Sequence, residues 1–96
     1  MTFNYREAQL YAESLSLEQL SERVGTPFYC YSAGMIRDRF QAYRSSFGPD
    51  RSLICYAVKA NSNQSVIRLL GEMGAGADVV SAGELQRALQ AGIPAN

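Results

Sequence analysis

The chain has 96 residues, with nine basic and nine acidic side chains and an apolar fraction of 47%. This length accommodates one domain at most, the apolar fraction argues against a disordered tail, and the neutral charge argues against binding to nucleic acid or an anionic membrane surface. Histidine is absent. These residues therefore cannot by themselves form a Ser-His-Asp or Cys-His nucleophile pair or a histidine-ligated metal site.

The first third of the chain carries weak strand signals followed by one clear helix. Residues 4–5 and 9–11 are compatible with two short strands around a turn. Ser16 and Gln19 have the spacing of a capping box, and Gly25, followed by a Thr-Pro pair, ends the predicted helix.

Three apolar runs then alternate with three helical patterns. The runs predict strands over Phe28–Tyr31, Leu53–Val58 and Ala77–Val80, and the second is continuous enough to be covered on both faces. The helices are predicted to be capped by Ser32, by Asn61 or Ser62, and by Ser81. Their inward residues are predicted to be Ile36, Phe40, Tyr43 and Phe47, then Val66, Leu69, Leu70 and Met73, then Leu85, Ala88 and Leu89. This order is typical of a parallel α/β fold.

Cysteine usage and the absence of targeting signals indicate a reducing compartment. Cys30 and Cys55 lie in apolar runs and fit no C-x-x-C spacing, which predicts two buried, reduced thiols. No basic stretch followed by an apolar run marks a signal peptide, and no segment approaches the roughly 20 apolar residues of a membrane span. We therefore expect a cytoplasmic protein. Three strands would leave two open sheet edges, so we also expect this chain to be part of a longer one.

Lys59 is the candidate for chemistry. It directly follows the predicted strand Leu53–Val58, and functional groups of parallel α/β folds gather at the C-terminal ends of strands. A solvated surface lysine is the ordinary interpretation. However, every other cationic position holds arginine, and lysine, unlike arginine, can act as a nucleophile and form an imine.

Three ordered blocks make the chain recognisable. They are Tyr-Ala-Val-Lys-Ala-Asn at 56–61, Asp-Val-Val-Ser-Ala-Gly-Glu-Leu at 78–85 and Ala-Gly-Ile-Pro at 91–94. Together with residues 25–32, they closely resemble the N-terminal part of the diaminopimelate decarboxylase family, over about residues 5–95. Ornithine and arginine decarboxylases share the lysine and the Asp-x-x-Ser-x-x-Glu spacing, whereas Asp-Val-Val-Ser favours the diaminopimelate branch.

The resemblance implies an α/β fold that is the N-terminal part of a (β/α)8 barrel: the first two βα units with the preceding strand and helix. Residues 1–31 would form an N-terminal segment associated with the family's β-domain, and residues 32–96 the start of the barrel. The implied cofactor is pyridoxal 5′-phosphate, with no metal, and the family works as a homodimer. Lys59 would form the aldimine, and Asp78 matches an acidic position on the cofactor side.

The implied reaction is decarboxylation of meso-2,6-diaminopimelate to L-lysine and CO2 in lysine biosynthesis, carried out by a longer enzyme, with these residues alone inactive. An ornithine or arginine decarboxylase, an amino-acid racemase of the same superfamily and a non-catalytic cofactor-binding or regulatory relative remain alternatives. Asp78 could instead cap the turn that follows it. Glu84 more simply closes a capping box with Ser81, and Asn61 could serve only as a helix cap.

Overall fold

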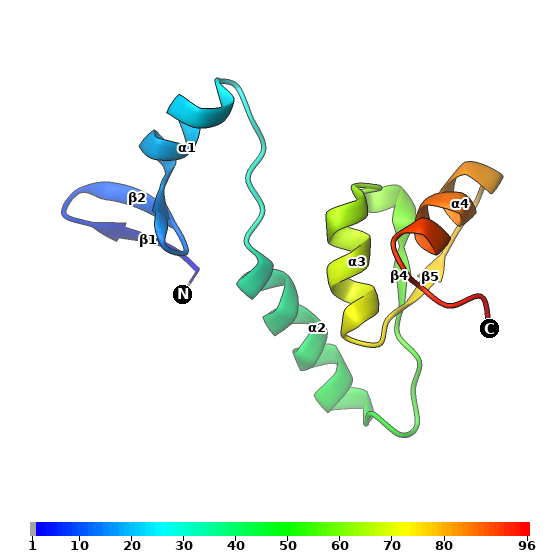
Figure 1. Ribbon diagram of the computed structural model, residues 1–96. Helices are drawn as coiled ribbons and strands as arrows, with labels where there is room; N and C mark the ends of the chain where they lie inside the picture. Colours follow the sequence, from blue (N-terminus) through cyan, green and yellow to red (C-terminus); the bar gives the residue numbers. More distant parts are fainter. Residues whose placement is uncertain (1) are drawn as a thin grey trace. The chain divides into compact units, whose positions relative to one another are not determined.

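The computed structural model describes residues 2–96 and divides them into two compact units, one ending at Ile36 and the other running from Arg37 to Asn96. Helix α2 begins in the first unit and continues into the second. The elements in chain order are β1 (Phe3–Arg6), β2 (Gln9–Ala12), β3 (Leu15–Ser16), α1 (Leu17–Val24), α2 (Ala33–Phe47), β4 (Cys55–Ala57), the 3-10 turn η1 (Val58–Ala60), α3 (Gln64–Glu72), β5 (Gly76–Asp78) and α4 (Ala82–Gln90) (Figure 1).

The N-terminal unit begins with a small antiparallel sheet in the order β1, β2, β3. Strands β1 and β2 confirm the two short strands predicted around a turn, and their register pairs Phe3 with Ala12. The turn residues Glu7 and Ala8 both have positive φ, 50° and 67°, as two-residue hairpin turns require. Strand β3 was not predicted, because two residues carry no readable periodicity.

Helix α1 follows as expected. The Ser16 hydroxyl accepts from Gln19 N at 3.1 Å and the Gln19 side chain accepts from Ser16 N at 3.3 Å, which confirms the capping box. Gly25 ends the helix at a φ of 78°, a left-handed value that favours glycine.

The strand predicted over Phe28–Tyr31 is wrong. This segment is irregular and pairs with no strand among residues 2–96, and Tyr29 is 92% exposed. A β-prone run becomes a strand only where a partner satisfies its backbone groups. The helix cap after it is confirmed, because Met35 N donates to the Ser32 hydroxyl at 3.2 Å.

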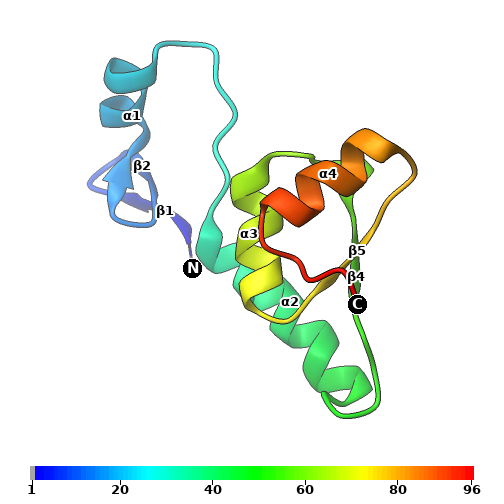
Figure 2. The ribbon, with the colours of Figure 1, turned by 45° about the vertical axis from the view of Figure 1, so that its right-hand side comes forward.

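The C-terminal unit is a parallel pair of strands with two helices against it. Strands β4 and β5 pair over three residues, with Cys55 opposite Gly76 and Ala57 opposite Asp78. Helices α3 and α4 lie side by side in both views (Figures 1 and 2). This confirms the parallel α/β fold class, although both strands are shorter than the predicted Leu53–Val58 and Ala77–Val80.

The core of this unit lies between the helices and one face of the strands. Its buried residues are Val58, Ile67, Ala88, Ala91 and Ile93, with Tyr56, Ala77 and Val79 packed against them. The opposite face is open: Leu53 is 72% exposed and Cys55 is exposed, so the expectation of cover on both faces is wrong for these residues.

The predicted inward faces are confirmed only in part. Phe40, Leu70 and Ala88 are buried, whereas Tyr43, Phe47, Leu85 and Leu89 are exposed. Ile67, which was not predicted to face inward, is fully buried. These apolar side chains are exposed because the rest of the described chain covers only part of the apolar face of each helix.

Both cysteines are free thiols, as predicted, but Cys30 is only half-buried and Cys55 is exposed. Within residues 2–96, no helix is long and apolar enough to cross a membrane. The same residues contain no group of three or more acidic, cysteine or histidine side chains placed to hold a metal ion.

Candidate functional site

Strand β4 carries the chain from the core to Lys59. Tyr56 and Val58 point towards the helices, since both belong to or pack against the buried cluster. Side chains alternate along a strand, so Cys55 and Ala57 belong to the opposite, open face. Lys59 follows on the 3-10 turn η1 and is exposed.

Asp78 lies on the same edge of the sheet. It is the last residue of β5 and is paired with Ala57, two positions before Lys59. Paired residues of neighbouring strands share a face, so Asp78 belongs to the open face as well. In the described part of the chain, neither the Lys59 amine nor the Asp78 carboxylate makes a hydrogen bond or an ion pair. The structure therefore brings the two predicted site residues to one edge without joining them, and the role of Asp78 stays a prediction.

The backbone after Lys59 is closely tied to its surroundings. Asn61 N donates to Val58 O at 3.2 Å, and the Tyr56 hydroxyl donates to Asn61 O at 2.9 Å. The Asn61 side chain accepts from Asn63 N at 3.0 Å, which forms a turn one step before the helix. The cap of α3 is Asn63, whose side chain accepts from Ser65 N at 2.8 Å, so the predicted caps Asn61 and Ser62 are wrong.

The loop after Asp78 is fixed in a similar way. The Ser81 hydroxyl accepts from Glu84 N at 3.1 Å, and Glu84 Oε1 accepts from Val80 N at 3.0 Å. This confirms Ser81 as the cap of α4. The capping box predicted between Ser81 and Glu84 is formed only in part, because the Glu84 carboxylate accepts from Val80 N, one residue before the cap, rather than from Ser81 N. Both α3 and α4 thus begin next to the strand ends that carry Lys59 and Asp78, with the positive ends of their dipoles on that edge.

Two features were missed from the sequence. Tyr56 was interpreted only as strand packing, whereas its hydroxyl also reaches across the Lys59 turn. Glu13 was not singled out, yet its Oε2 accepts from the Ser32 hydroxyl at 2.8 Å and from Gly34 N at 3.2 Å at the start of α2. No sequence signal indicates either bond. Each joins a side chain to another segment, and local sequence patterns do not predict where that segment lies in space.

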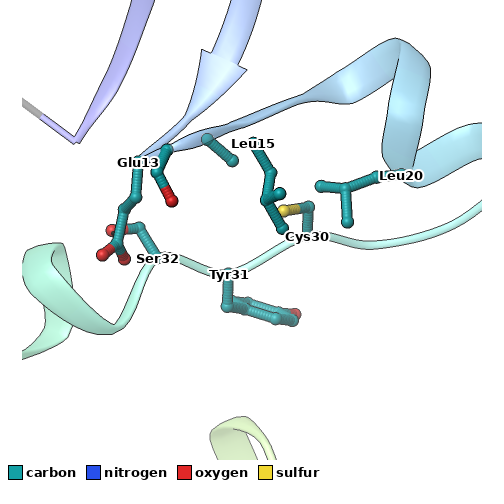
Figure 3. Close-up of a pocket in the computed structure, with 8 residues that line it drawn as sticks. Glu13, Leu15, Leu20, Cys30, Tyr31 and Ser32 are labelled. Carbon is teal, nitrogen blue, oxygen red and sulfur yellow. Dashed lines mark hydrogen bonds between the residues drawn. The ribbon is translucent and has the colours of Figure 1, made fainter.

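Glu13 and Ser32 line a cavity of about 270 Å³ in the N-terminal unit (Figure 3). Figure 3 shows Cys30 between Leu15 and Leu20 on its other side. The Glu13 carboxylate is already engaged in capping α2. This cavity therefore offers chiefly hydrocarbon and one thiol, and it is a poorer candidate for chemistry than the edge with Lys59.

The residues on that edge fit the aldehyde end of pyridoxal phosphate. Covalent attachment needs an accessible primary amine that is not held in an ion pair, and Lys59 is exposed and has no ion-pair partner in the described residues. Asp78, at the neighbouring strand end, supplies a carboxylate for a charge-assisted hydrogen bond.

Comparisons with known proteins also indicate a pyridoxal-dependent decarboxylase. Residues 33–96 match the family model "Pyridoxal-dependent decarboxylase, pyridoxal binding domain". The chain is 57% identical over 90 residues to a diaminopimelate decarboxylase of Aquifex aeolicus and 48% identical over 91 residues to that of Pseudomonas aeruginosa, covering 94% and 95% of this chain but 21% and 22% of those relatives. It thus spans about a fifth of their length.

A solved structure agrees. The diaminopimelate decarboxylase of M. jannaschii, crystallised in complex with L-lysine, superposes with a TM-score of 0.89 at 32% identity. The superposition covers 97% of this chain and 23% of that one.

Proposed function

Since this chain belongs to the pyridoxal-dependent decarboxylase family, whose pyridoxal binding domain its residues 33–96 match, we propose that it forms the first part of the cofactor site of a diaminopimelate decarboxylase. Membership confirms the family resemblance, and with it pyridoxal phosphate as the family's cofactor. The two βα units β4–α3 and β5–α4 correspond to the N-terminal part of the family's barrel.

The observation that carries the proposal is the placement of Lys59. The only lysine of the chain stands at the C-terminal end of a strand, exposed and free of any ion pair among the described residues. Lys59 Nζ would hold the cofactor through a covalent bond. Asp78 would orient it, or the amine itself, through a charge-assisted hydrogen bond.

When bound, pyridoxal phosphate supplies an electron sink for the electron pair left behind as CO2 departs. Lys59 would also have a second task. When its Nζ is not bonded to the cofactor, it would lie on the same edge of the sheet, where it could deliver a proton to the substrate carbon that loses the carboxylate.

For the whole gene product, we propose decarboxylation of meso-2,6-diaminopimelate to L-lysine and CO2 by a cytoplasmic homodimer. The support is the family, the names of the relatives and the L-lysine bound in the M. jannaschii structure. We expect residues 1–96 alone to show no turnover, because they span about a fifth of the relatives' length.

The test is borohydride reduction of the purified gene product with pyridoxal phosphate, followed by peptide mapping and a decarboxylation assay. We expect the adduct on Lys59. In Lys59→Ala and in Lys59→Arg, which keeps the charge but cannot form an imine, we expect decarboxylation to fall by roughly a thousandfold or more. A Lys59→Arg protein with near wild-type activity, or an adduct on another residue, would overturn the role of Lys59.

The same assay decides the substrate. Release of CO2 from ornithine or arginine, or racemisation of an amino acid, in place of turnover of diaminopimelate would move the protein to another branch of the superfamily. A stoichiometric and catalytically active Lys59 adduct formed by residues 1–96 alone would contradict the expectation that decarboxylation needs additional residues.

A further inference from the structure

The turn that carries Lys59 has little to define it by itself. Turn η1 spans only Val58–Ala60, and the backbone bond that closes it runs from Asn61 N to Val58 O at 3.2 Å. Hydrogen bonds in 3-10 turns have poor geometry, so one such bond defines the path of the backbone weakly. Contacts from outside the turn therefore decide how it is held.

Tyr56 spans this turn. Its side chain packs against the buried cluster that contains Val58 and Ile67, and its hydroxyl donates to Asn61 O at 2.9 Å. Tyr56 comes three residues before Lys59, and Asn61 comes two residues after it. The bond therefore closes a short loop, residues 56–61, that contains Lys59. Through the Tyr56 ring, this loop is anchored to the core of the unit.

The far side of this loop is continuous with α3. The Asn61 side chain accepts from Asn63 N, and the Asn63 side chain accepts from Ser65 N in the first turn of the helix. Residues 61–63 are thus fixed to α3, and the Tyr56 hydroxyl ties the strand to them. Without that hydroxyl, the turn would still keep the bond from Asn61 N to Val58 O but would lose the tie from the Tyr56 ring to Asn61.

The direction of the Lys59 side chain depends on this backbone, because no hydrogen bond or ion pair holds its amine in the described part of the chain. We propose that Tyr56 is a positioning residue for Lys59, its hydroxyl fixing the turn so that Nζ meets the aldehyde carbon of the cofactor in a reactive orientation. This inference rests on the proposed function of Lys59 and adds to it a residue that acts through the turn.

The test is Tyr56→Phe in the gene product, which keeps the ring and removes the hydroxyl. We expect cofactor-free protein to form the Lys59 adduct roughly three- to tenfold more slowly, the range that the loss of one hydrogen bond supports. The turnover number for diaminopimelate should fall with it, while KM stays within about twofold. Tyr29→Phe makes the same chemical change at a side chain that is 92% exposed, and it should leave both rates unchanged.

A second readout needs no cofactor. Hydrogen exchange of cofactor-free protein should be roughly threefold or more faster in a peptide over residues 58–63 of Tyr56→Phe, and unchanged over residues 3–12. Wild-type rates of adduct formation in Tyr56→Phe, whether or not its exchange or melting temperature changes, would assign the hydroxyl to packing alone and overturn the inference.

The two proposals fail in different ways. If the wild type forms no adduct on Lys59, the proposed function is wrong and the positioning role falls with it. If the wild type forms the adduct and Tyr56→Phe forms it equally fast, the function stands and only the role of Tyr56 is rejected.

Discussion

Among the described residues up to Ile36, the buried side chains are those of two serines, Ser16 and Ser32. From Arg37 onwards every buried side chain is apolar. The N-terminal unit therefore depends on hydrogen bonds, namely a strand ladder, the capping box of α1 and the Glu13 cap of α2. The C-terminal unit depends on the removal of apolar surface from water.

This difference bears on function, because the candidate site lies in the unit with the apolar core. Val58, which precedes Lys59 directly, is fully buried and anchors one end of the turn. Residues supported by packed elements hold their geometry better than residues on loops. The contrast also predicts mutational effects of different size in the two units. Truncating a core side chain lowers the free energy of unfolding by more than removing a single hydrogen bond does.

The largest effect is expected for Ile67→Ala. Ile67 is fully buried in the cluster beneath β4 and β5. Truncating it should lower the free energy of unfolding by about 2–5 kcal/mol, as measured by urea denaturation of the chain followed by circular dichroism. Val66→Ala, at the half-buried neighbouring position, is the control and should cost about 1 kcal/mol or less. Equal losses for the two variants would mean that the core does not dominate this unit.

The fold was predictable where a local signal decides the structure. Ser16 with Gln19, and Ser81 with Glu84, mark helix starts because a cap satisfies backbone groups within four residues of chain. Strands were overpredicted, since a strand extends only as far as its partner. β5 pairs with β4 over three residues, and Phe28–Tyr31 finds no partner in the described chain.

The site was predictable to the level of Lys59 and no further. A lone lysine after an apolar run and the block around it singled out that residue. Whether Asn61, Ser62 or Asn63 caps α3 depends on where the turn after β4 ends, and neighbouring polar residues give no means to choose. The bond from Tyr56 to Asn61 depends on the same turn, which is why it was missed.

An intermediate effect is expected for Glu13→Gln in the N-terminal unit. The Glu13 carboxylate accepts from Ser32 and Gly34 at the N-terminus of α2, where a negative charge is favoured. The amide keeps the shape but removes the charge, so we expect a loss of about 1–1.5 kcal/mol. Faster hydrogen exchange over residues 32–36 would report it.

Glu22→Gln is the control for this change, because Glu22 is exposed and lies beyond the first turn of α1, away from a helix start. It should change stability by less than about 0.5 kcal/mol. If Glu13→Gln is equally silent, the polar contacts do not hold the N-terminal unit together, and the contrast between the two units weakens.

The smallest effects come from removing one hydroxyl in each unit. Ser16 and Ser81 both accept from the backbone of the residue three positions on, at 3.1 Å, but Ser16 is 4% exposed whereas Ser81 is exposed. Water can replace the Ser81 hydroxyl at Glu84 N more readily than it can replace the Ser16 hydroxyl at Gln19 N. We expect Ser16→Ala to cost about 1 kcal/mol and Ser81→Ala about 0.5 kcal/mol in urea denaturation. A larger loss for Ser81→Ala would show that caps matter more beside the apolar core, and it would reverse the distinction between the two units.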